Sequence, residues 1–359
     1  MESVTFDDLD RRLIHALQLD GRASYSRIAA VLGVPDRTIA RRYLRLRSRL
    51  IVRVVGNIDS RRIGMLDWFV RIRCLPATAE ALAQTLSQRA DTSWIAPLVG
   101  GTEITCMVRT PSGEDEARPS NEARPSFFDQ LGRTPGVRDV LASCVLRPIV
   151  GVGGWKGRMR ALDASEQVRL RPSTPLEAPE APEAVDLARG TIVWSDGDER
   201  LARALAEDGR AALSHLRSAT GWSESTVRQR ITRLRDAGVL DFEVEVHPGF
   251  FGRSVEAIVW LEVAPGQLMA VTEALSRHDL VAYAAITTGQ ATVVAILECR
   301  DTDALYEYLA TDLADVAGIG RVEISIAQRR TKRAGPVAPV ASRPPRTRSD
   351  DSTKSSRPA

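Results

Sequence analysis

The sequence has few cysteines and no long apolar run. Its four cysteines, Cys74, Cys106, Cys144 and Cys299, are far apart and lie in apolar segments. Neither their spacing nor that of the four histidines predicts a metal site or a disulfide framework. No segment approaches the roughly 20 apolar residues that a membrane helix needs, and the acidic N-terminus lacks the apolar core of a signal peptide. We therefore expect a cytoplasmic protein with buried free thiols, no metal and no other cofactor.

Lysine is almost absent. It occurs only at Lys156, Lys332 and Lys354, so arginine carries nearly all of the positive charge. The 49 Lys and Arg residues are nearly balanced by 46 Asp and Glu, which leaves a formal net charge of +3. The overall charge therefore does not indicate a nucleic-acid partner, and the placement of the arginines has to decide that question.

The chain contains an internal repeat. Residues 10–22 and 198–210 both begin with Asp and end with Asp-Gly-Arg, at an offset of 188 residues, and the same offset pairs Gly101 with Gly289. Residues 116–127 consist of one six-residue unit written twice, which indicates a small duplication in a surface loop of the first copy. A long internal repeat predicts two copies of one structural unit.

Three short helices are predicted at the start of each copy. In the first copy, apolar residues recur at helical spacing from Leu9 to Leu17, and Gly21 ends that helix. Ser24 is a suitable N-cap for a second helix, and Pro35 is suited to the first turn of a third. Three short helices with a tight glycine-containing turn before the last are typical of a helix-turn-helix domain.

The third helix of the first copy has two different faces. Ile39, Tyr43 and Leu46 form an apolar stripe, while Arg37 begins a series of arginines that recurs every four residues. Like charges at this spacing repel each other, which is unusual for an ordinary solvated face, and guanidinium groups suit phosphates and guanine edges. We therefore favour contact with double-stranded DNA, although the second copy is less basic and the two need not bind equally. The predicted DNA-binding residues are Arg37, Thr38, Arg41, Arg42, Arg45, Arg49, Ser225, Arg228, Gln229 and Arg233.

The remaining two thirds of each copy alternate between strand and helix signals in the order β-α-β-β-α-β, which is typical of a ferredoxin-like domain. We therefore predict an α+β protein with two winged-type helix-turn-helix domains and two ferredoxin-like domains in tandem. The predicted segments are helix-turn-helix domains at 7–56 and 195–246, ferredoxin-like domains at 64–153 and 252–330, a Pro/Glu/Ala-rich linker at 165–194 and a disordered basic tail at 331–359.

This combination resembles the leucine-responsive regulator (Lrp/AsnC) family of transcription regulators. Each motif alone is weak, but their order and spacing, met twice, are specific. The residues that carry the resemblance in the first copy are Leu9, Asp10, Leu13, Leu17, Asp20, Gly21, Arg22, Ile28, Ala29, Gly33, Val34, Thr38, Arg42, Arg45, Leu46, Gly64, Leu98 to Gly101 and Thr134 to Val137.

The resemblance implies that the two ferredoxin-like domains pair through their sheets and bind an amino acid or a similar small effector near the hairpin after the second strand. The matching residues are Val99, Gly100, Gly101, Thr102, Glu103, Thr288, Gly289 and Gln290. Many members carry an aspartate at this hairpin. Glu103 takes its place in the first copy, whereas the second copy has Ala291. The alternative is that the glycines only form the turn.

We expect the pairing of these domains to occur within one chain, and the resemblance implies further assembly into a homo-oligomer. The predicted interface residues are Val70, Ile72, Ile104, Cys106, Ile258, Trp260, Val294 and Ile296.

The sequence thus predicts an effector-modulated, sequence-specific DNA-binding regulator that is not an enzyme. One alternative is an enzyme of the same fold that decarboxylates sirohaem, but the predicted strands carry no histidine and no nucleophile-base pair. Another is a DNA-architectural protein without an effector. The basic tail is interpreted either as inert or as an arm that raises non-specific affinity for DNA.

Overall fold

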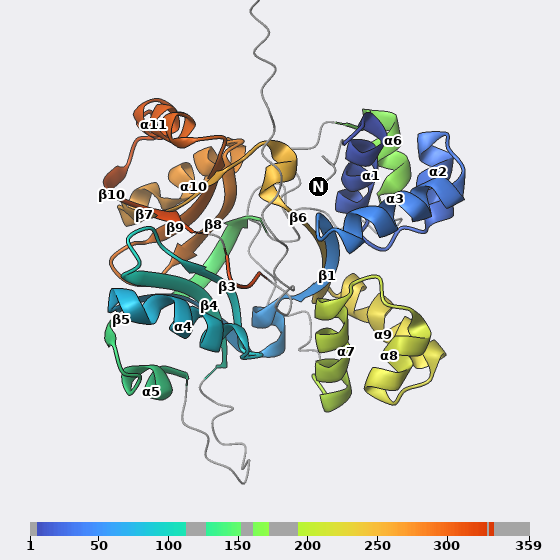
Figure 1. Ribbon diagram of the computed structural model, residues 1–359, viewed down its shortest axis with the longest axis horizontal. Coiled ribbons are helices and arrows are strands. Elements are labelled where there is room, and N and C mark those ends of the chain that lie inside the picture. Colours follow the sequence, from blue (N-terminus) through green and yellow to red (C-terminus); the bar gives the residue numbers. More distant parts are fainter. Residues whose placement is uncertain (1–5, 113–126, 152–160, 172–192, 329, 334–359) are drawn as a thin grey trace, which may run out of the picture.

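The computed structural model describes residues 6–112, 127–151, 161–171, 193–328 and 330–333. The duplicated loop, most of the predicted linker and nearly all of the basic tail lie outside these residues. The predicted disorder is wrong for the first residues of the tail, 331–333: the N–H of Thr331 donates to the carbonyl of Ile95 at 2.8 Å, and Lys332 is buried with its Nζ donating to the carbonyl of Arg89. The two helix-turn-helix domains lie together on one side of the molecule, and the two ferredoxin-like domains lie together on the other (Figure 1). The predicted α+β fold is confirmed.

Each helix-turn-helix domain has three helices, and the two domains share one apolar core. The helices are α1 (Asp8–Leu19), α2 (Tyr25–Leu32) and α3 (Asp36–Ser48) in the first copy, and α7 (Asp196–Glu207), α8 (Leu213–Thr220) and α9 (Glu224–Asp236) in the second. Capping boxes begin α1 and α7, because the side chains of Asp7 and Ser195 accept hydrogen bonds from the backbone three residues later.

A two-stranded antiparallel ribbon joins the two helix-turn-helix domains. It consists of β1 (Val52–Ile58) and β6 (Leu240–Val246), which pair along their whole length. Gly56 allows α7 to pack closely on this ribbon, since a Cβ atom there would lie 2.7 Å from the Cβ of Leu205. The strand that follows each helix-turn-helix thus binds its counterpart from the other copy.

The ferredoxin-like domains form one eight-stranded sheet with the order β10-β7-β9-β8-β5-β2-β4-β3. In chain order the elements of the first copy are η1 (Ser60–Ile63), β2 (Met65–Cys74), α4 (Pro76–Ser87), β3 (Thr92–Pro97), β4 (Glu103–Pro111), α5 (Phe127–Gly132) and β5 (Val137–Val150). Those of the second copy are η3 (Pro248–Phe251), β7 (Val255–Val263), η4 (Pro265–Gln267), α10 (Leu268–Arg277), β8 (Val281–Thr287), β9 (Val293–Cys299), α11 (Thr302–Ala310) and β10 (Ile319–Ala327).

Each copy contributes four neighbouring strands to this sheet, and the two four-stranded halves are joined along both of their edges. Strand β5 pairs with β8, and at the other end Leu98, just after β3, forms a bridge with Ala327 of β10. One buried cluster contains residues of both halves, among them Phe69 and Trp260, whose rings meet edge to face with centroids 6.4 Å apart. The predicted pairing of the two copies within one chain is therefore confirmed.

The predicted interface was correct for the second copy and wrong for the first. Ile258, Trp260 and Val294 lie in the shared cluster, and Ile296 lies opposite Ile258 in the β7–β9 ladder. The first-copy residues pack instead with α4 and α5 on the outer face of the sheet, and they are Val70, Ile72, Ile104 and Cys106. An alignment of the two copies at a uniform offset of 188 residues pairs Val70 with Ile258, which lies on the inner face of the sheet. In the first copy, however, Phe69 occupies that inner face, one residue before Val70. A slip of one residue along a strand moves every side chain to the opposite face.

The predicted linker also begins later than expected. Residues Ala164–Leu170 form a helix, α6, which packs against α1 and α2 with Leu162 and Leu170 buried. The Pro/Glu/Ala-rich sequence starts only after this helix. The sequence analysis missed the helix because it is short and lies directly beside that linker sequence.

Of the cysteines, three are buried and Cys144 is half-buried, and all four are free thiols. Burial raises the pKa of the Cys106 thiol to about 12. Within the residues that the structure describes, no cluster of His, Cys, Asp or Glu side chains could hold a metal ion, and no helix is long and apolar enough to cross a bilayer.

Candidate nucleic-acid interface

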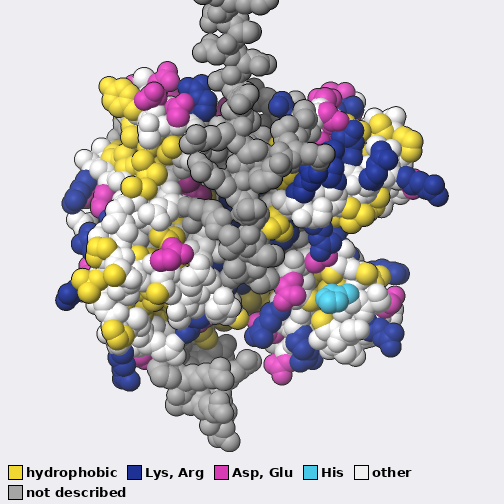
Figure 2. Space-filling model, in the orientation of Figure 1, with side chains coloured by type: hydrophobic (Ala, Val, Ile, Leu, Met, Phe, Trp, Pro, Cys, Tyr) yellow, Lys and Arg dark blue, Asp and Glu magenta, His cyan; other side chains and the backbone are white. Residues whose placement is uncertain are grey.

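Helix α3 presents an exposed face opposite the one that packs in the core. Ile39, Tyr43 and Leu46 are fully buried against the other helices of the domain. One helical face away from them, exposed side chains follow each other at spacings of three and four residues. They are Arg37, Arg41, Leu44 and Ser48. Figure 2 shows basic side chains gathered over this domain, whereas basic and acidic side chains are interspersed over the domain of α7, α8 and α9.

The arginines of α3 fall into two groups. Arg37, Arg41 and, just beyond the helix, Arg49 are exposed and have no ion pair with any residue that the structure describes. Arg42 donates from Nη1 to Asp7 Oδ1 at 2.6 Å and to Asp10 Oδ1 at 2.9 Å, and Arg45 Nη2 lies 2.5 Å from Asp10 Oδ2. The carboxylate of Asp10 is fully buried, and an unpaired buried carboxylate would be costly. Arg42 and Arg45 therefore hold α3 against the start of α1.

Helix α9 repeats this arrangement with one arginine. Arg230 Nε lies 2.6 Å from Oδ1 of Asp198, which is 1% exposed, and these two residues are 188 positions after Arg42 and Asp10. The other predicted DNA-binding residues of this helix, Ser225, Arg228, Gln229 and Arg233, are exposed. Thr38 is half-buried. The sequence analysis did not identify the buried aspartates as partners, although both begin the repeated segment.

Asn in place of Asp198 should destabilise the second helix-turn-helix domain. Burial opposes ionisation of Asp198, but the hydrogen bonds from Arg230 and Ser195 hold the pKa of its carboxyl below the ordinary 3.8. The pair therefore contributes stability that is present above pH 4 and is lost as pH falls through the lower, folded pKa. We expect Asp198→Asn to lower the free energy of unfolding by about 3 kcal/mol at pH 7, as measured by urea unfolding. The difference from wild type should shrink in acid, and a constant difference down to pH 2 would contradict this assignment.

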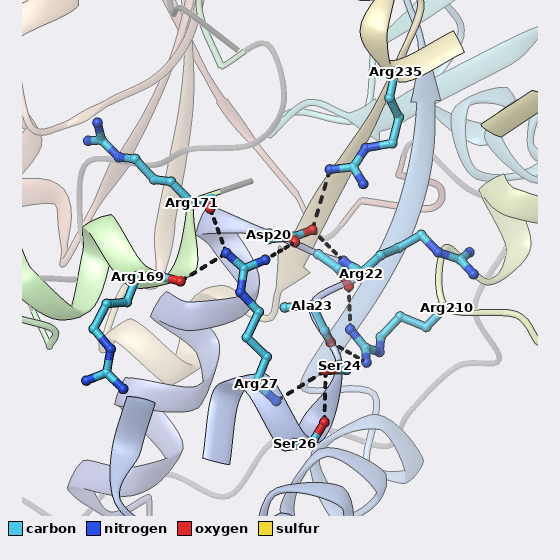
Figure 3. Close-up of polar contacts among 11 residues, drawn as sticks. Asp20, Arg22, Ala23, Ser24, Ser26, Arg27, Arg169, Arg171, Arg210 and Arg235 are labelled. Atoms are coloured by element: carbon cyan, nitrogen blue, oxygen red, sulfur yellow. Dashed lines mark hydrogen bonds and ion pairs between the residues drawn. The ribbon is translucent and has the colours of Figure 1, made fainter. Parts of the chain in front are cut away.

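A reciprocal clamp locks the two helix-turn-helix domains together. Arg22 donates to the backbone oxygen of Gly209 at 2.7 Å, and Arg210 donates to that of Gly21 at 2.6 Å. A second hydrogen bond from each guanidinium reaches the carbonyl two residues further on in the other copy. Figure 3 shows Arg210 reaching into the turn before α2. The Asp-Gly-Arg sequence that identifies the repeat therefore holds the copies together.

Ion pairs between the copies continue the clamp with the same symmetry. Arg47 of α3 lies 2.8 Å from Asp208. Arg235 of α9 lies 3.5 Å from Asp20 (Figure 3), so an arginine near the end of each third helix binds the turn of the other copy. The guanidinium of Arg210 also lies over the ring of Tyr25, 4.6 Å from its centroid. Together with the β1–β6 ribbon, these contacts set the distance and angle between α3 and α9.

Helix α6 packs against α1 and α2 of the first helix-turn-helix domain. Arg27 of α2 donates to the backbone oxygens of Arg169 and Arg171 at 2.9 and 2.7 Å (Figure 3). The backbone N–H of Leu162 donates to Nδ1 of His15 at 3.1 Å, and burial keeps the pKa of this histidine below its ordinary value, as a neutral acceptor requires. The first domain thus has a fourth helix that gives it a surface unlike that of the second.

The two predicted effector hairpins lie where the halves of the large sheet meet. In the first copy, the N–H of Val99 donates to the carbonyl of Ile326 at 2.8 Å, beside Gly100 and Gly101, which have φ of +108° and +67°. In the second copy, Thr288 and Cys144 exchange two hydrogen bonds of 2.8 and 2.9 Å. Thr102 and Gln290 are exposed at the tips of the two hairpins, and Gly289 lies between Thr288 and Gln290.

The carboxylate of Glu103 is already paired. Its Oε2 accepts from Arg71 Nη2 at 2.7 Å and its Oε1 accepts from Arg73 Nε at 2.9 Å. The same Arg71 nitrogen lies 2.6 Å from Glu323 of the second copy, and the guanidinium stacks 4.3 Å from the centroid of the Trp260 ring. Arg71 is 7% exposed. The sequence analysis missed this arginine, because its charge hid an inward-facing position of β2.

The fold and the arginine-bearing face of α3 define a DNA-binding protein of the helix-turn-helix class. Residues 6–47 and 196–235 match the AsnC-type helix-turn-helix domain, and residues 256–337 match the Lrp/AsnC ligand-binding domain. The HTH-type transcriptional regulator FL11 of Pyrococcus abyssi is 30% identical over 113 residues, which are 31% of this chain and 75% of that protein. The chain belongs to the Lrp/AsnC family of transcriptional regulators, in a form that carries two copies of the unit.

Two further known proteins resemble this chain, one in sequence and one in fold. The HTH-type transcriptional regulator LrpA of Pyrococcus horikoshii is 23% identical over 126 residues, 35% of this chain and 89% of that protein. The siroheme decarboxylase NirDL, solved with an iron-uroporphyrin III analogue, superposes with a TM-score of 0.58 at 12% identity, over 92% of this chain and 93% of that one. This second likeness shows a common fold. The named relatives are regulators, in line with the prediction that the chain is not an enzyme.

Proposed function

We propose that this regulator binds a specific operator by placing the exposed faces of α3 and α9 in the major groove. The observation that carries the proposal is the division of the α3 arginines. Arg42 and Arg45 are paired with Asp10, whereas Arg37 and Arg41 are exposed on the outer face and have no ion pair among the described residues. Unpaired guanidinium groups are suited to guanine edges. Footprinting on genomic fragments tests this proposal, and a failure to find any protected sequence would contradict it.

The predicted DNA-binding residues then have different roles. Arg49, Arg228 and Arg233 are exposed at the sides or ends of the recognition helices and are suited to phosphates. Each should contribute about one unit to the salt dependence of binding. Arg42 and Arg45 hold α3 in place through their ion pairs with the start of α1, which leaves them little capacity to contact DNA.

We also propose an amino-acid-like effector at the junction of the ferredoxin-like domains. A bound amino acid could offer an ammonium group to Glu103 and a carboxylate to Arg71 or Arg73. It would then compete with the Arg71–Glu323 ion pair that connects the two copies. Effector binding would thereby change how the two ferredoxin-like domains are held relative to each other. The position of both hairpins at the junction of the two copies, beside the charged groups of Glu103 and Arg71, supports this site.

A thermal-shift screen against the twenty amino acids should reveal a ligand that raises the melting temperature. The Glu103→Gln variant should reduce that shift strongly, because a neutral amide binds an ammonium group poorly, while the Glu273→Gln variant, at an exposed carboxylate of α10, should leave it unchanged. The absence of any shift in the wild-type protein would favour a DNA-architectural protein. A visible absorption change on adding a tetrapyrrole would favour the decarboxylase alternative.

The proposed assembly is a homo-oligomer of these internally paired chains, acting in the cytoplasm where the DNA is. Light scattering coupled to size-exclusion chromatography measures the first directly. The basic tail, which lies almost wholly outside the described residues, remains assigned either to an inert segment or to an electrostatic arm, and its deletion distinguishes the two by non-specific affinity at low salt.

A further inference from the structure

Helices α3 and α9, which we propose to enter the major groove, are held in equivalent positions in their two domains. Helices α3 and α9 are both 13 residues long and begin 188 residues apart. In both, an arginine at the same position binds a buried aspartate of the first helix of its domain. Their core positions are all apolar or aromatic, and the equivalent pairs are Ile39 and Val227, Tyr43 and Ile231, and Leu46 and Leu234. Any difference between the outer faces is therefore a difference in side chains at matched positions.

The outer faces differ at every matched position. All eight side chains are exposed, and the pairs are Arg37 and Ser225, Arg41 and Gln229, Leu44 and Thr232, and Ser48 and Asp236. Two guanidinium groups and an apolar side chain, with Leu44 57% exposed, face outward from α3. A hydroxyl, an amide, a second hydroxyl and a carboxylate face outward from α9. The core positions keep their apolar or aromatic character, whereas the four positions that would face bases change their chemistry.

These chemistries suit different base pairs. Arginine binds the O6 and N7 atoms of guanine with two hydrogen bonds, and an apolar side chain contacts the thymine methyl group. Glutamine binds the N6 and N7 atoms of adenine, and serine and threonine are permissive. Asp236 carries a negative charge on the outer face of α9, which disfavours close approach to phosphate. The clamp between Arg22 and Arg210 holds the two faces in a fixed relation, so one chain presents both at once.

We propose that one chain recognises a non-palindromic operator, with a guanine- and thymine-containing half-site under α3 and an adenine-containing half-site under α9. This inference rests on the proposed function, because it assumes that both helices enter the major groove. A dimer of identical single-copy chains would present the same face twice and select a palindrome. Fusion of two copies removes that constraint, and the outer faces of α3 and α9 have diverged accordingly.

Selection of bound duplexes from a randomised library, with the full-length wild-type chain, tests the inference. We expect two unlike half-sites in the enriched sequence. Duplexes that repeat either half-site should bind at least tenfold more weakly than the mixed duplex at 150 mM salt. Enrichment of a palindrome, or equal affinity for the mixed duplex and either repeat, overturns the inference and leaves the proposed function standing. No enrichment of any sequence overturns both.

A triple variant provides an independent test. Ser225→Arg/Gln229→Arg/Thr232→Leu gives α9 three of the four outer side chains of α3 and leaves Asp236 in place. It should shift the preference at least tenfold towards the duplex that repeats the α3 half-site. Gln84→Arg/Gln88→Arg adds two positive charges at exposed positions in and directly after α4, and serves as the control. It should leave the preference unchanged. A folded triple variant, checked by its melting temperature, that keeps the wild-type preference overturns the inference.

Discussion

Replacing Arg37 and Arg41 together with alanine should abolish specific binding of the operator while leaving the protein folded. Both side chains are exposed, and neither has an ion pair within the described part of the chain, so their removal leaves no buried group without a partner. Each arginine that reads a base contributes about 1–3 kcal/mol. We expect a combined loss of about 4 kcal/mol, or roughly a thousandfold in affinity, measured by fluorescence anisotropy at fixed salt.

The control for this experiment is a pair of arginines with similar exposure elsewhere. Arg277 and Arg300 belong to the second ferredoxin-like domain, and their side chains are 69% and 76% exposed. The Arg277→Ala/Arg300→Ala variant removes the same charge and should bind the operator almost as wild type does. Equal weakening by the two double variants would show that net charge, and not the outer face of α3, determines the affinity.

Breaking the reciprocal clamp should have the largest effect on stability. In the Arg22→Ala/Arg210→Ala variant, four hydrogen bonds from guanidinium groups to backbone carbonyls of the opposite copy are lost. Hydrogen bonds that involve charged groups contribute about 1.5–3 kcal/mol each when partly buried, but solvent replaces some of them here. We expect the free energy of unfolding to fall by about 4 kcal/mol, as measured by urea unfolding followed by far-ultraviolet circular dichroism.

The same variant should also lose cooperation between half-sites. Without the clamp, α3 and α9 are connected mainly by the β1–β6 ribbon, so a duplex with both half-sites should gain little over a duplex with one. The matched control is Arg203→Ala, which removes an exposed i,i+4 ion pair with Glu199 and should cost less than 1 kcal/mol. If the clamp variant kept wild-type stability, the shared apolar core, the β1–β6 ribbon and the ion pairs of Arg47 and Arg235 would be sufficient to hold the two domains together.

Local patterns in the sequence were sufficient for the repeated elements and their order, although they missed α6. The apolar spacing from Leu9 to Leu17 and at Ile39, Tyr43 and Leu46 predicted α1 and α3, because a helix buries one face and the period of 3.6 residues appears directly in the chain. The repeated glycines predicted the two hairpins and the equivalence of the copies. The family assignment also followed from these patterns, since order and spacing survive when individual residues change.

The roles of charged residues could not be predicted, because a charge in the sequence does not reveal its partner. Arg37 and Arg42 look alike in the chain, yet one is exposed and the other binds a buried aspartate 32 residues away. Arg71 received no prediction from the sequence, yet it stacks on Trp260 between the two copies. The inner face of the first-copy half of the sheet was also assigned wrongly. A shift of one residue between the two copies cannot be detected from the sequence, because it appears only in the register of the paired strands.

The sequence alone thus established two copies of a helix-turn-helix and ferredoxin-like unit, together with the family, because helix periods, turn glycines and repeat offsets are local properties. The tertiary structure decided which arginines remain available to DNA, which ones join the copies, and which strand faces meet. These outcomes depend on contacts between residues that are up to 252 positions apart, as Arg71 and Glu323 are. Such contacts are selected by burial and by the pairing of charges, and both exist only after the chain has folded.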